Sequence, residues 1–218
     1  GASVTADMTV VEPALAATKT VRNVTPNKQA TDSAAGGDIL EYVVTIPNSG
    51  NATAYDANIA DTLPASLTLN GAFTPTAVLQ PSGSTITFNA TPQLIDGATV
   101  WGRANGDGTL DIPAGQTLVL TYRVNVADAS VASIANRVFV DWTSLDNLQG
   151  GERTGANCGT TTPIAAPNDY CVGPATVTVN TVDTNAIAKS VGADSWDTGL
   201  SAANDAILRV GDTVNYRV

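Results

Sequence analysis

Hydrophobic and polar residues alternate along several short segments of this chain. In the clearest one, Leu118, Leu120, Tyr122, Val124 and Val126 take every second position. Such alternation is typical of a β-strand with one face on a core, and turns rich in Gly, Pro and Asn separate the segments. The predicted strands are Ala14–Val21, Ile39–Ile46, Tyr55–Asp61, Thr85–Asn89, Thr117–Val126, Ile134–Trp142 and Ala175–Val182. Many short antiparallel strands predict an all-β sandwich.

Three polar residues stand in phase with the apolar face of their own strands: Lys19, Asp61 and Asn136. Burying one polar group alone costs roughly 1–3 kcal/mol, whereas three groups buried together can satisfy one another. Burial also lowers the pKa of a lysine and raises that of an aspartate, which leaves a nucleophilic amine beside a protonated carboxyl. The pattern therefore predicts an isopeptide bond from Lys19 to Asn136, formed with loss of ammonia and with Asp61 as acid and base. The alternative is a snorkelling lysine, an aspartate that caps the turn before Pro64, and an asparagine bonded to the backbone.

The chain contains an internal echo. "GGDILEYVVT" at Gly36–Thr45 resembles "VGDTVNYRV" at Val210–Val218, and an apolar strand with one lysine, Lys19 or Lys189, precedes each segment. The matching order predicts a fragment of a tandem array. The predicted division is an N-terminal arm at 1–10, a β-sandwich domain at 11–183, and the first strands of a second repeat at 184–218.

The motifs "GGDILEYVVTIPNSGNATAYDANIADTLPASLTL", "IPAGQTLVLTYRVNV" and "IANRVFVDW" resemble the DUF11 family of prokaryotic surface repeats. The resemblance covers most of residues 11–182 and implies an Ig-like antiparallel β-sandwich in a long secreted or wall-attached protein. The chain is also similar to the isopeptide-forming domains of pili and adhesins, which use Lys, Asp and Asn in that chain order. It departs from the family in a long insert, Thr143–Gly173.

The insert holds both cysteines of the chain, Cys158 and Cys171. Its polar composition offers little core, and a bridge that closes a loop of this length contributes roughly 3 kcal/mol. We therefore expect a disulfide, as is usual in secreted proteins. The competing zinc site lacks ligands, because the chain has no histidine.

Calcium is the one cofactor for which the sequence offers a candidate site. In "NGDGTLD", Asn105, Asp107 and Asp111 have the oxygen spacing of a calcium loop, but Arg103 stands where the first acidic ligand belongs. An ordinary turn at Asn-Gly or Asp-Gly is the alternative.

Charge and composition narrow the function. The net charge is −10, and the ten basic residues are scattered, which argues against nucleic acid and membrane surfaces as partners. No apolar run reaches the roughly 20 residues of a membrane span. Without histidine, Ser–His and Cys–His dyads are absent, so we expect no enzyme beyond a single self-modification.

Two function classes follow from the sequence. The first is a structural repeat of an extracellular stalk, adhesin or filament, whose partners are neighbouring repeats or copies of the same protein. The second is a secreted module that binds a surface glycan or protein ligand through the surface of the sandwich or the Thr143–Gly173 loop. Trp101 and Trp142 are candidate sugar platforms, although Trp142 has the parity of a core residue.

Overall fold

The computed structural model describes residues 7–86, 93–95, 98–101, 110–147, 149–155, 158, 170–182, 190–191 and 216–217. The described residues form strands and turns and contain no helix, so none of them lies in a helix that could cross a membrane. The chain divides into two compact units, 1–182 and 183–218. The first unit has two antiparallel sheets, which confirms the predicted Ig-like β-sandwich.

The first sheet has the strand order β1-β2-β8-β4, with β5 also paired to β8. These strands are β1 (Thr18–Asn23), β2 (Ile39–Pro47), β4 (Leu67–Leu69), β5 (Thr76–Gln80) and β8 (Thr117–Val126). β2 and β8 pair along their whole lengths, and this register sets Tyr42 directly opposite Tyr122.

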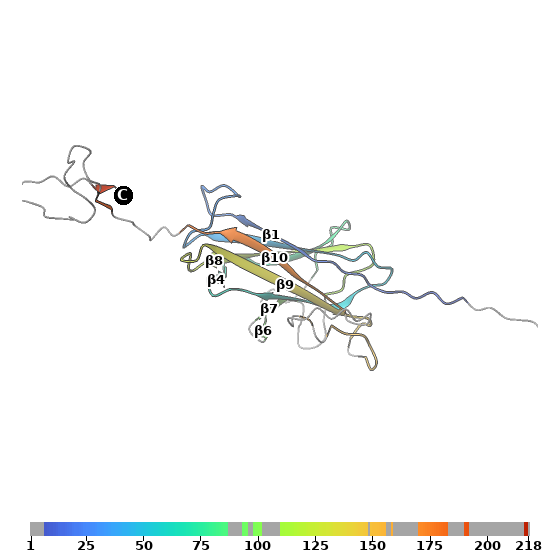
Figure 1. The fold of residues 1–218 in the computed structure, drawn as a ribbon. Coiled ribbons are helices and arrows are strands. Elements are labelled where there is room, and N and C mark those ends of the chain that lie inside the picture. Colours follow the sequence, from blue (N-terminus) through green and yellow to red (C-terminus); the bar gives the residue numbers. More distant parts are fainter. Residues whose placement is uncertain are drawn as a thin grey trace, which may run out of the picture. The chain divides into compact units, whose positions relative to one another are not determined.

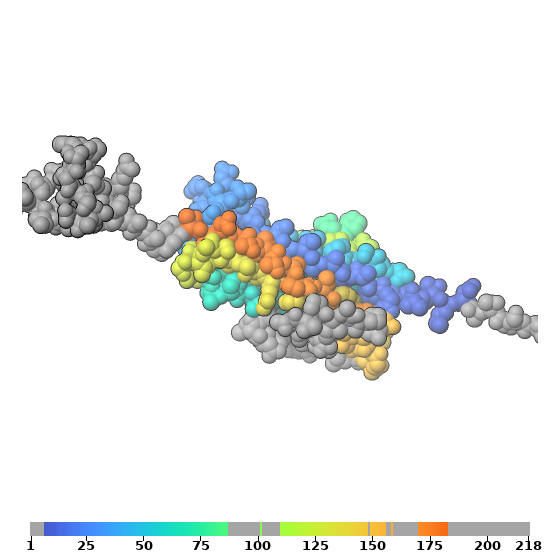
Figure 2. All heavy atoms as spheres, viewed as in Figure 1, coloured from blue at the N-terminus to red at the C-terminus, as the bar shows by residue number. Residues whose placement is uncertain are grey.

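The second sheet has the order β10-β9-β3-β7-β6. Its strands are β3 (Tyr55–Thr62), β6 (Gln93–Ile95), β7 (Ala98–Trp101), β9 (Ser133–Thr143) and β10 (Cys171–Asn180). The long strands β9 and β10 run side by side in Figure 1. Along the face shown in Figure 2, β10 also lies beside β1 of the other sheet, and the two strands are in contact.

The core lies between the two sheets and consists of the inward positions of the alternating strands. The largest side chains with almost no exposure are Trp101, Tyr42, Tyr122, Leu40, Ile46, Ile59, Leu110, Ile112, Leu118, Leu120, Ile134 and Val44. Burying an aliphatic or aromatic side chain of this size contributes roughly 1.5–3 kcal/mol, so the core supplies the main stabilisation of the sandwich.

The "NSGN" segment between β2 and β3 anchors the polypeptide that precedes β1. The Asn48 side chain accepts a hydrogen bond from the Ala14 amide at 3.1 Å, and the Asn51 side chain accepts one from the Glu12 amide at 2.7 Å. A Cβ at Gly50 would lie 2.3 Å from the Glu12 carbonyl oxygen, so this close approach requires glycine. The motif therefore fixes the entry of the first strand into the sandwich.

Several predicted boundaries differ from the structure. The first strand begins at Thr18 instead of Ala14, and only an isolated bridge at Leu15 precedes it. The last strand of the domain spans Cys171–Asn180 instead of Ala175–Val182. Of the predicted strand Thr85–Asn89, Thr85 forms an isolated bridge with Val78, and 87–89 lie outside the described residues. β4, β5, β6 and β7 were not predicted, because three to five residues carry too little alternation to recognise.

The second unit contains one described strand pair, β11 (Ser190–Val191) with β12 (Tyr216–Arg217). Val191 pairs with Tyr216 there, just as Val21 pairs with Tyr42 between β1 and β2. The backbone register of this pair is thus the one that the sequence echo predicts. The tandem repeat itself, and the position of Lys189, stay predictions.

Candidate functional site

Three strands from both sheets bring polar side chains into the core. Lys19 on β1, Asp61 on β3 and Asn136 on β9 have whole-residue exposed fractions of 7%, 0% and 0%. The β3–β9 register pairs Asp61 with Val138, so Asn136 is the diagonal neighbour of Asp61 on the same face. The strand parity that drew attention to these residues therefore corresponds to their burial.

Hydrogen bonds connect the three residues in one chain. The Lys19 ammonium forms a hydrogen-bonded ion pair with Oδ2 of Asp61, and the Tyr122 hydroxyl donates to the same oxygen. The Asn136 amide nitrogen donates to the Tyr122 hydroxyl at 3.4 Å. Asp61 therefore contacts the Lys19 amine directly and is connected to the Asn136 amide through the Tyr122 hydroxyl.

Aromatic rings surround the lysine. Its Nζ lies 4.8 Å from the ring centroid of Tyr42 and 5.6 Å from that of Tyr122, within the range of a cation–π contact. Tyr122 also packs against Tyr42 at 5.4 Å and against Trp101 at 4.5 Å between centroids. These rings exclude water from the amine and the carboxyl.

Burial changes the ionisation of both members of the ion pair. It lowers the pKa of Lys19 to about 8, although the charge of Asp61 and the hydrogen bond to it oppose the shift. Burial also raises the pKa of Asp61, against the opposing influence of Lys19, Tyr122 and Asn136. A neutral amine beside a protonated carboxyl is therefore much nearer in free energy to the ion pair than it would be in water.

The arrangement holds the three functions that amide exchange needs: an amine, an acid and a carboxamide. β1 belongs to one sheet and β9 to the other, so a bond from Lys19 to Asn136 would join the two sheets covalently. All three side chains are buried. The chemistry of the site would act on the chain itself.

Sequence reasoning missed the aromatic members of this site, Tyr42, Tyr122 and Trp101. Two signals were present: Tyr122 belongs to the clearest alternation in the chain, and Tyr42 lies in the repeated segment. The hypothesis that Trp101 is a sugar platform is wrong, because its exposed fraction is 0%. Trp142, with an exposed fraction of 5%, has the core position that its strand parity predicted. Both rings pack in the core, against Tyr122 and Tyr170 respectively, and present no open face to a sugar.

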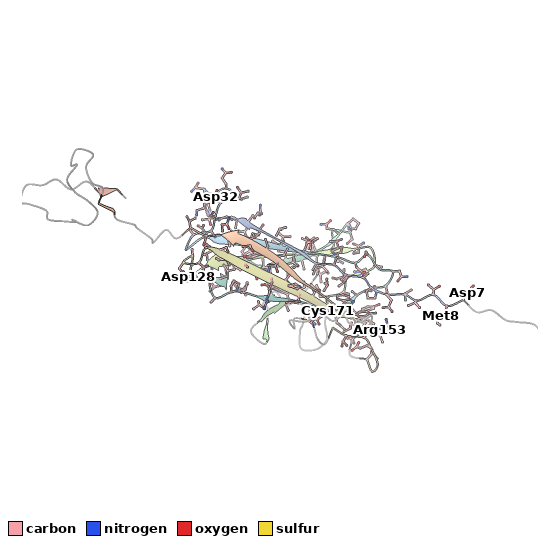
Figure 3. All side chains as sticks on the ribbon, viewed as in Figure 1. Asp7, Met8, Asp32, Asp128, Arg153 and Cys171 are labelled. Carbon is pink, nitrogen blue, oxygen red and sulfur yellow. A yellow bond between two sulfur atoms is a disulfide. The ribbon has the colours of Figure 1, made fainter. Side chains whose placement is uncertain are left out.

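The predicted disulfide is confirmed. Cys158 and Cys171 are bonded with an S–S distance of 2.01 Å, and Cys171 opens β10 opposite Asp141 of β9. The bridge therefore attaches the insert to the edge of the second sheet. In Figure 3, Cys171 and Arg153 lie toward one end of the sandwich, and Asp32 and Asp128 lie toward the other.

A surface cleft of about 510 Å³ lies beside the insert. Within it, Glu12 forms hydrogen bonds with Arg153 and with the Tyr170 hydroxyl, so the polypeptide before β1 is attached to the insert. The hydrogen bond from Tyr170 is the main cause of a lowered pKa at Glu12. These polar groups satisfy one another across the cleft.

Three carboxylates, those of Asp56, Asp111 and Asp146, approach so that one oxygen of each lies within 4.8 Å of the others. Burial raises the pKa of Asp56 and of Asp111, and repulsion from Asp146 adds to both shifts. Asn105 and Asp107 of the predicted calcium loop lie outside the described residues. Calcium at Asp111 stays a prediction.

Comparisons with known proteins gave structural likenesses only. No family model matches the chain, so the DUF11 resemblance stays a prediction, and no curated protein sequence matches it either. Among solved structures, the chain is similar to the collagen-binding domain of a Staphylococcus aureus adhesin, with a TM-score of 0.41 and 11% identity over 76% of this chain and 97% of that one.

Two further likenesses are to pilus and fimbrial proteins. The Actinomyces fimbrial adhesin FimA gives a TM-score of 0.43 and 15% identity over 76% of this chain and 56% of that one. The Corynebacterium diphtheriae major pilin SpaA, described with stabilizing isopeptide bonds, gives 0.44 and 19% over 77% of this chain and 39% of that one. With TM-scores below 0.5, these likenesses leave the function to be inferred from the residues of this chain.

Proposed function

We propose that the chain is a structural module of an extracellular stalk, adhesin or filament, and that its sandwich closes itself through an isopeptide bond between Lys19 and Asn136. The observation that carries the proposal is the buried chain of hydrogen bonds from Lys19 through Asp61 and Tyr122 to Asn136. A disulfide in the insert suits an oxidising, extracellular location. No separate substrate enters this chemistry, so the module is not an enzyme that turns over.

The burial of the site favours a reactive role over a purely structural one. A buried ion pair often contributes no more to stability than apolar residues of similar volume, because two charges must leave water. At this site, three buried oxygens also lack a hydrogen-bond partner among the described residues: Oδ1 of Asp61, Oδ1 of Asn136 and the Tyr42 hydroxyl. A site arranged only for stability would be expected to satisfy these atoms.

A bond between Lys19 and Asn136 would have a large mechanical consequence. The two residues lie 117 positions apart, since 136 − 19 = 117, so the covalent ring would enclose most of the first unit. Force applied along the polypeptide would pass through the bond and would not separate β1 from its neighbours. That property suits a stalk or filament.

Intact-protein mass spectrometry tests the proposal. The folded chain should weigh less than its sequence mass, corrected for the disulfide, by one ammonia, and tandem mass spectra should contain a branched peptide that joins Lys19 to Asn136. Asp61→Ala should have the full mass, because the acid that activates the amide is gone.

The matched control is Lys28→Ala. Lys28 forms the other lysine–aspartate pair of the described residues, with Asp38, and lies outside the buried site. Its removal should leave the mass deficit unchanged. A full mass in the mature unaltered protein would overturn the crosslink.

The alternative function is a glycan- or ligand-binding module. Trp101 and Trp142 cannot serve it as sugar platforms, because both are buried in the core. The cleft at Glu12, Arg153 and Tyr170 is the place where such a module would offer polar groups to a ligand. A glycan array with the isolated protein distinguishes the two functions, since specific binding that is lost in Arg153→Ala would favour the alternative.

A further inference from the structure

Tyr122 occupies a special place in the buried site because it is the connection between the acid and the amide. Its ring has no exposed surface and is held between Tyr42 and Trp101. Its hydroxyl contacts Oδ2 of Asp61 on one side and Nδ2 of Asn136 on the other. The packing of the ring thus fixes where the hydroxyl lies.

The number of hydrogens on this hydroxyl decides how the Asn136 amide is turned. A phenol has one hydrogen, and that hydrogen is donated to Asp61, so toward Asn136 the oxygen can only accept. The group of Asn136 that faces Tyr122 must therefore be the NH2. The carbonyl oxygen faces the other way and has no partner among the described residues.

From this geometry we infer that Tyr122 is a positioning residue for the bond between Lys19 and Asn136, because its hydroxyl accepts a hydrogen bond from the leaving NH2 and so fixes how the amide is turned. The inference rests on the proposed function. In this arrangement the carbonyl oxygen of Asn136 has no donor among the described residues and can accept one when the amide reacts.

The step balances with the groups present. Neutral Nζ of Lys19 forms a bond to Cγ of Asn136 while protonated Asp61 donates a hydrogen bond to the carbonyl oxygen. The bond from Cγ to Nδ2 then breaks, and a proton from the lysine nitrogen passes through Asp61 to Nδ2. Ammonia leaves, and the product is a secondary amide, with no oxidant, reductant or other reactant required.

The test measures how fast ammonia is lost in Tyr122→Phe, which keeps the ring and removes the hydroxyl. Chains that have been kept in denaturant since their synthesis, and so have not yet folded, are refolded by dilution. Their intact mass is then followed with time at a series of pH values. A misdirected amide should slow bond formation on the order of 10- to 100-fold, the usual penalty for lost alignment of reacting groups.

The pH profile separates positioning from packing. The titratable groups around Asp61 are Lys19, Tyr42 and Tyr122, and the hydrogen bond from Tyr122 lowers the pKa of the Asp61 carboxyl. Without that bond, the carboxyl keeps its proton to higher pH, so the optimum for bond formation should move to higher pH in Tyr122→Phe. A purely structural role for the hydroxyl would leave the optimum in place.

Tyr170→Phe is the matched control, because it removes the hydroxyl of another buried, stacked tyrosine, one that contacts Glu12 instead of Asp61. It should react like the unaltered chain. Equal rates and equal pH optima for Tyr122→Phe and the unaltered chain would overturn the role of Tyr122 alone. If the unaltered chain never loses ammonia, the proposed function itself fails.

A second measurement covers the case in which Tyr122→Phe does not fold. Incorporating 3-fluorotyrosine at all five tyrosines keeps every ring and hydroxyl but makes each hydroxyl a stronger donor. Asp61 should then lose its proton at lower pH, and the optimum for bond formation should move down, opposite to the shift in Tyr122→Phe. An unchanged optimum would overturn the inference.

Discussion

Two lysine–aspartate pairs in the first unit use the same side chains in different surroundings. Lys19 and Asp61 come from different sheets, and both side chains have 0% exposure. Lys28 and Asp38 lie in the connection between β1 and β2, with Nζ 2.7 Å from Oδ2 and side-chain exposures of 31% and 7%. One pair is enclosed by aromatic rings, and the other has its lysine partly in water.

The surroundings shift the two carboxyl groups in opposite directions. Burial raises the pKa of Asp61 more than its partners lower it. Burial alone would also raise the pKa of Asp38, but hydrogen bonds from Lys28, from the Ala35 amide and from Asn23 outweigh it and lower the pKa. A backbone donor and a side-chain amide thus make Asp38 a stable anion that anchors the start of β2.

Under the proposed function, a lysine–aspartate pair becomes reactive only when two conditions are met. The charges must lose their water, so that the neutral forms become accessible, and an electrophile must stand beside them. The buried pair has Asn136 connected through Tyr122, whereas the amide beside Asp38, that of Asn23, donates its hydrogens to Asp38 and to a carbonyl. Solvent access and donor direction, not residue type, separate the two pairs.

The largest difference between the two pairs should appear when each lysine is replaced by alanine. Lys19→Ala cannot form the proposed covalent ring over 117 residues, so it should lower the free energy of unfolding on the order of 5 kcal/mol, by the chain-entropy argument for a loop of this length. Lys28→Ala loses one partly exposed ion pair and should cost about 1 kcal/mol or less. Denaturant unfolding of both variants and the unaltered chain measures the difference.

Asn136→Ala separates the crosslink from the ion pair in that experiment, because it keeps Lys19 beside Asp61 but offers no acceptor. Most of the loss seen in Lys19→Ala should already be present in it. Nearly equal stabilities of Lys19→Ala and Lys28→Ala would contradict a covalent ring.

Part of this site could be predicted from the sequence, because strand parity decides which face a side chain takes. That argument gave the burial of Lys19, Asp61 and Asn136, each of which lies on a segment with regular alternation. Parity does not give the depth of a side chain or the direction of its hydroxyl, so the role of Tyr122 could not be predicted. Trp101 was misjudged because its strand, β7, has only four residues and no recognisable alternation.

The strands of the fold also divide into those that the sequence predicts and those that it does not. Strands of eight to eleven residues, such as β8 and β9, show enough periods to be predicted nearly to their ends. β4 and β5 are held by pairing with β8, and that tertiary contact leaves no local signal in the sequence. The disulfide was predictable for a simpler reason, since the chain has only two cysteines.

The free energy of unfolding of Asn136→Ala should depend on pH through the buried pair, because this variant keeps Lys19 beside Asp61 without a crosslink. The pKa of Lys19 is lowered from 10.5 to about 8, so above pH 8 the unfolded chain binds a proton that the folded chain has released. Stability should therefore rise between these two values, by roughly 3 kcal/mol at most. Urea unfolding across this range, with the double variant Lys19→Ala and Asn136→Ala as control, isolates the lysine; identical curves would mean that Lys19 keeps an ordinary pKa.

The smallest effect belongs to the pair of Lys28 and Asp38, and its pH dependence lies in the acid range instead of the alkaline range. Asp38→Asn removes the charge that Lys28, Asn23 and the Ala35 amide stabilise, and should cost about 1–2 kcal/mol at neutral pH. Because folding lowers the pKa of Asp38, its stabilising contribution is complete above the unfolded value of 3.8 and is lost as the pH falls through the folded value. The difference between Asp38→Asn and the unaltered chain should therefore shrink toward zero in acid.

Asp32→Asn is the control, because Asp32 is a half-buried aspartate in the same connection that accepts a hydrogen bond from the Gln29 amide. It should differ from the unaltered chain by only a few tenths of a kcal/mol. If the loss of stability in Asp38→Asn stayed unchanged in acid, its cause would be altered packing and not the lost charge. The electrostatic difference between the two pairs would then depend on Asp61 alone.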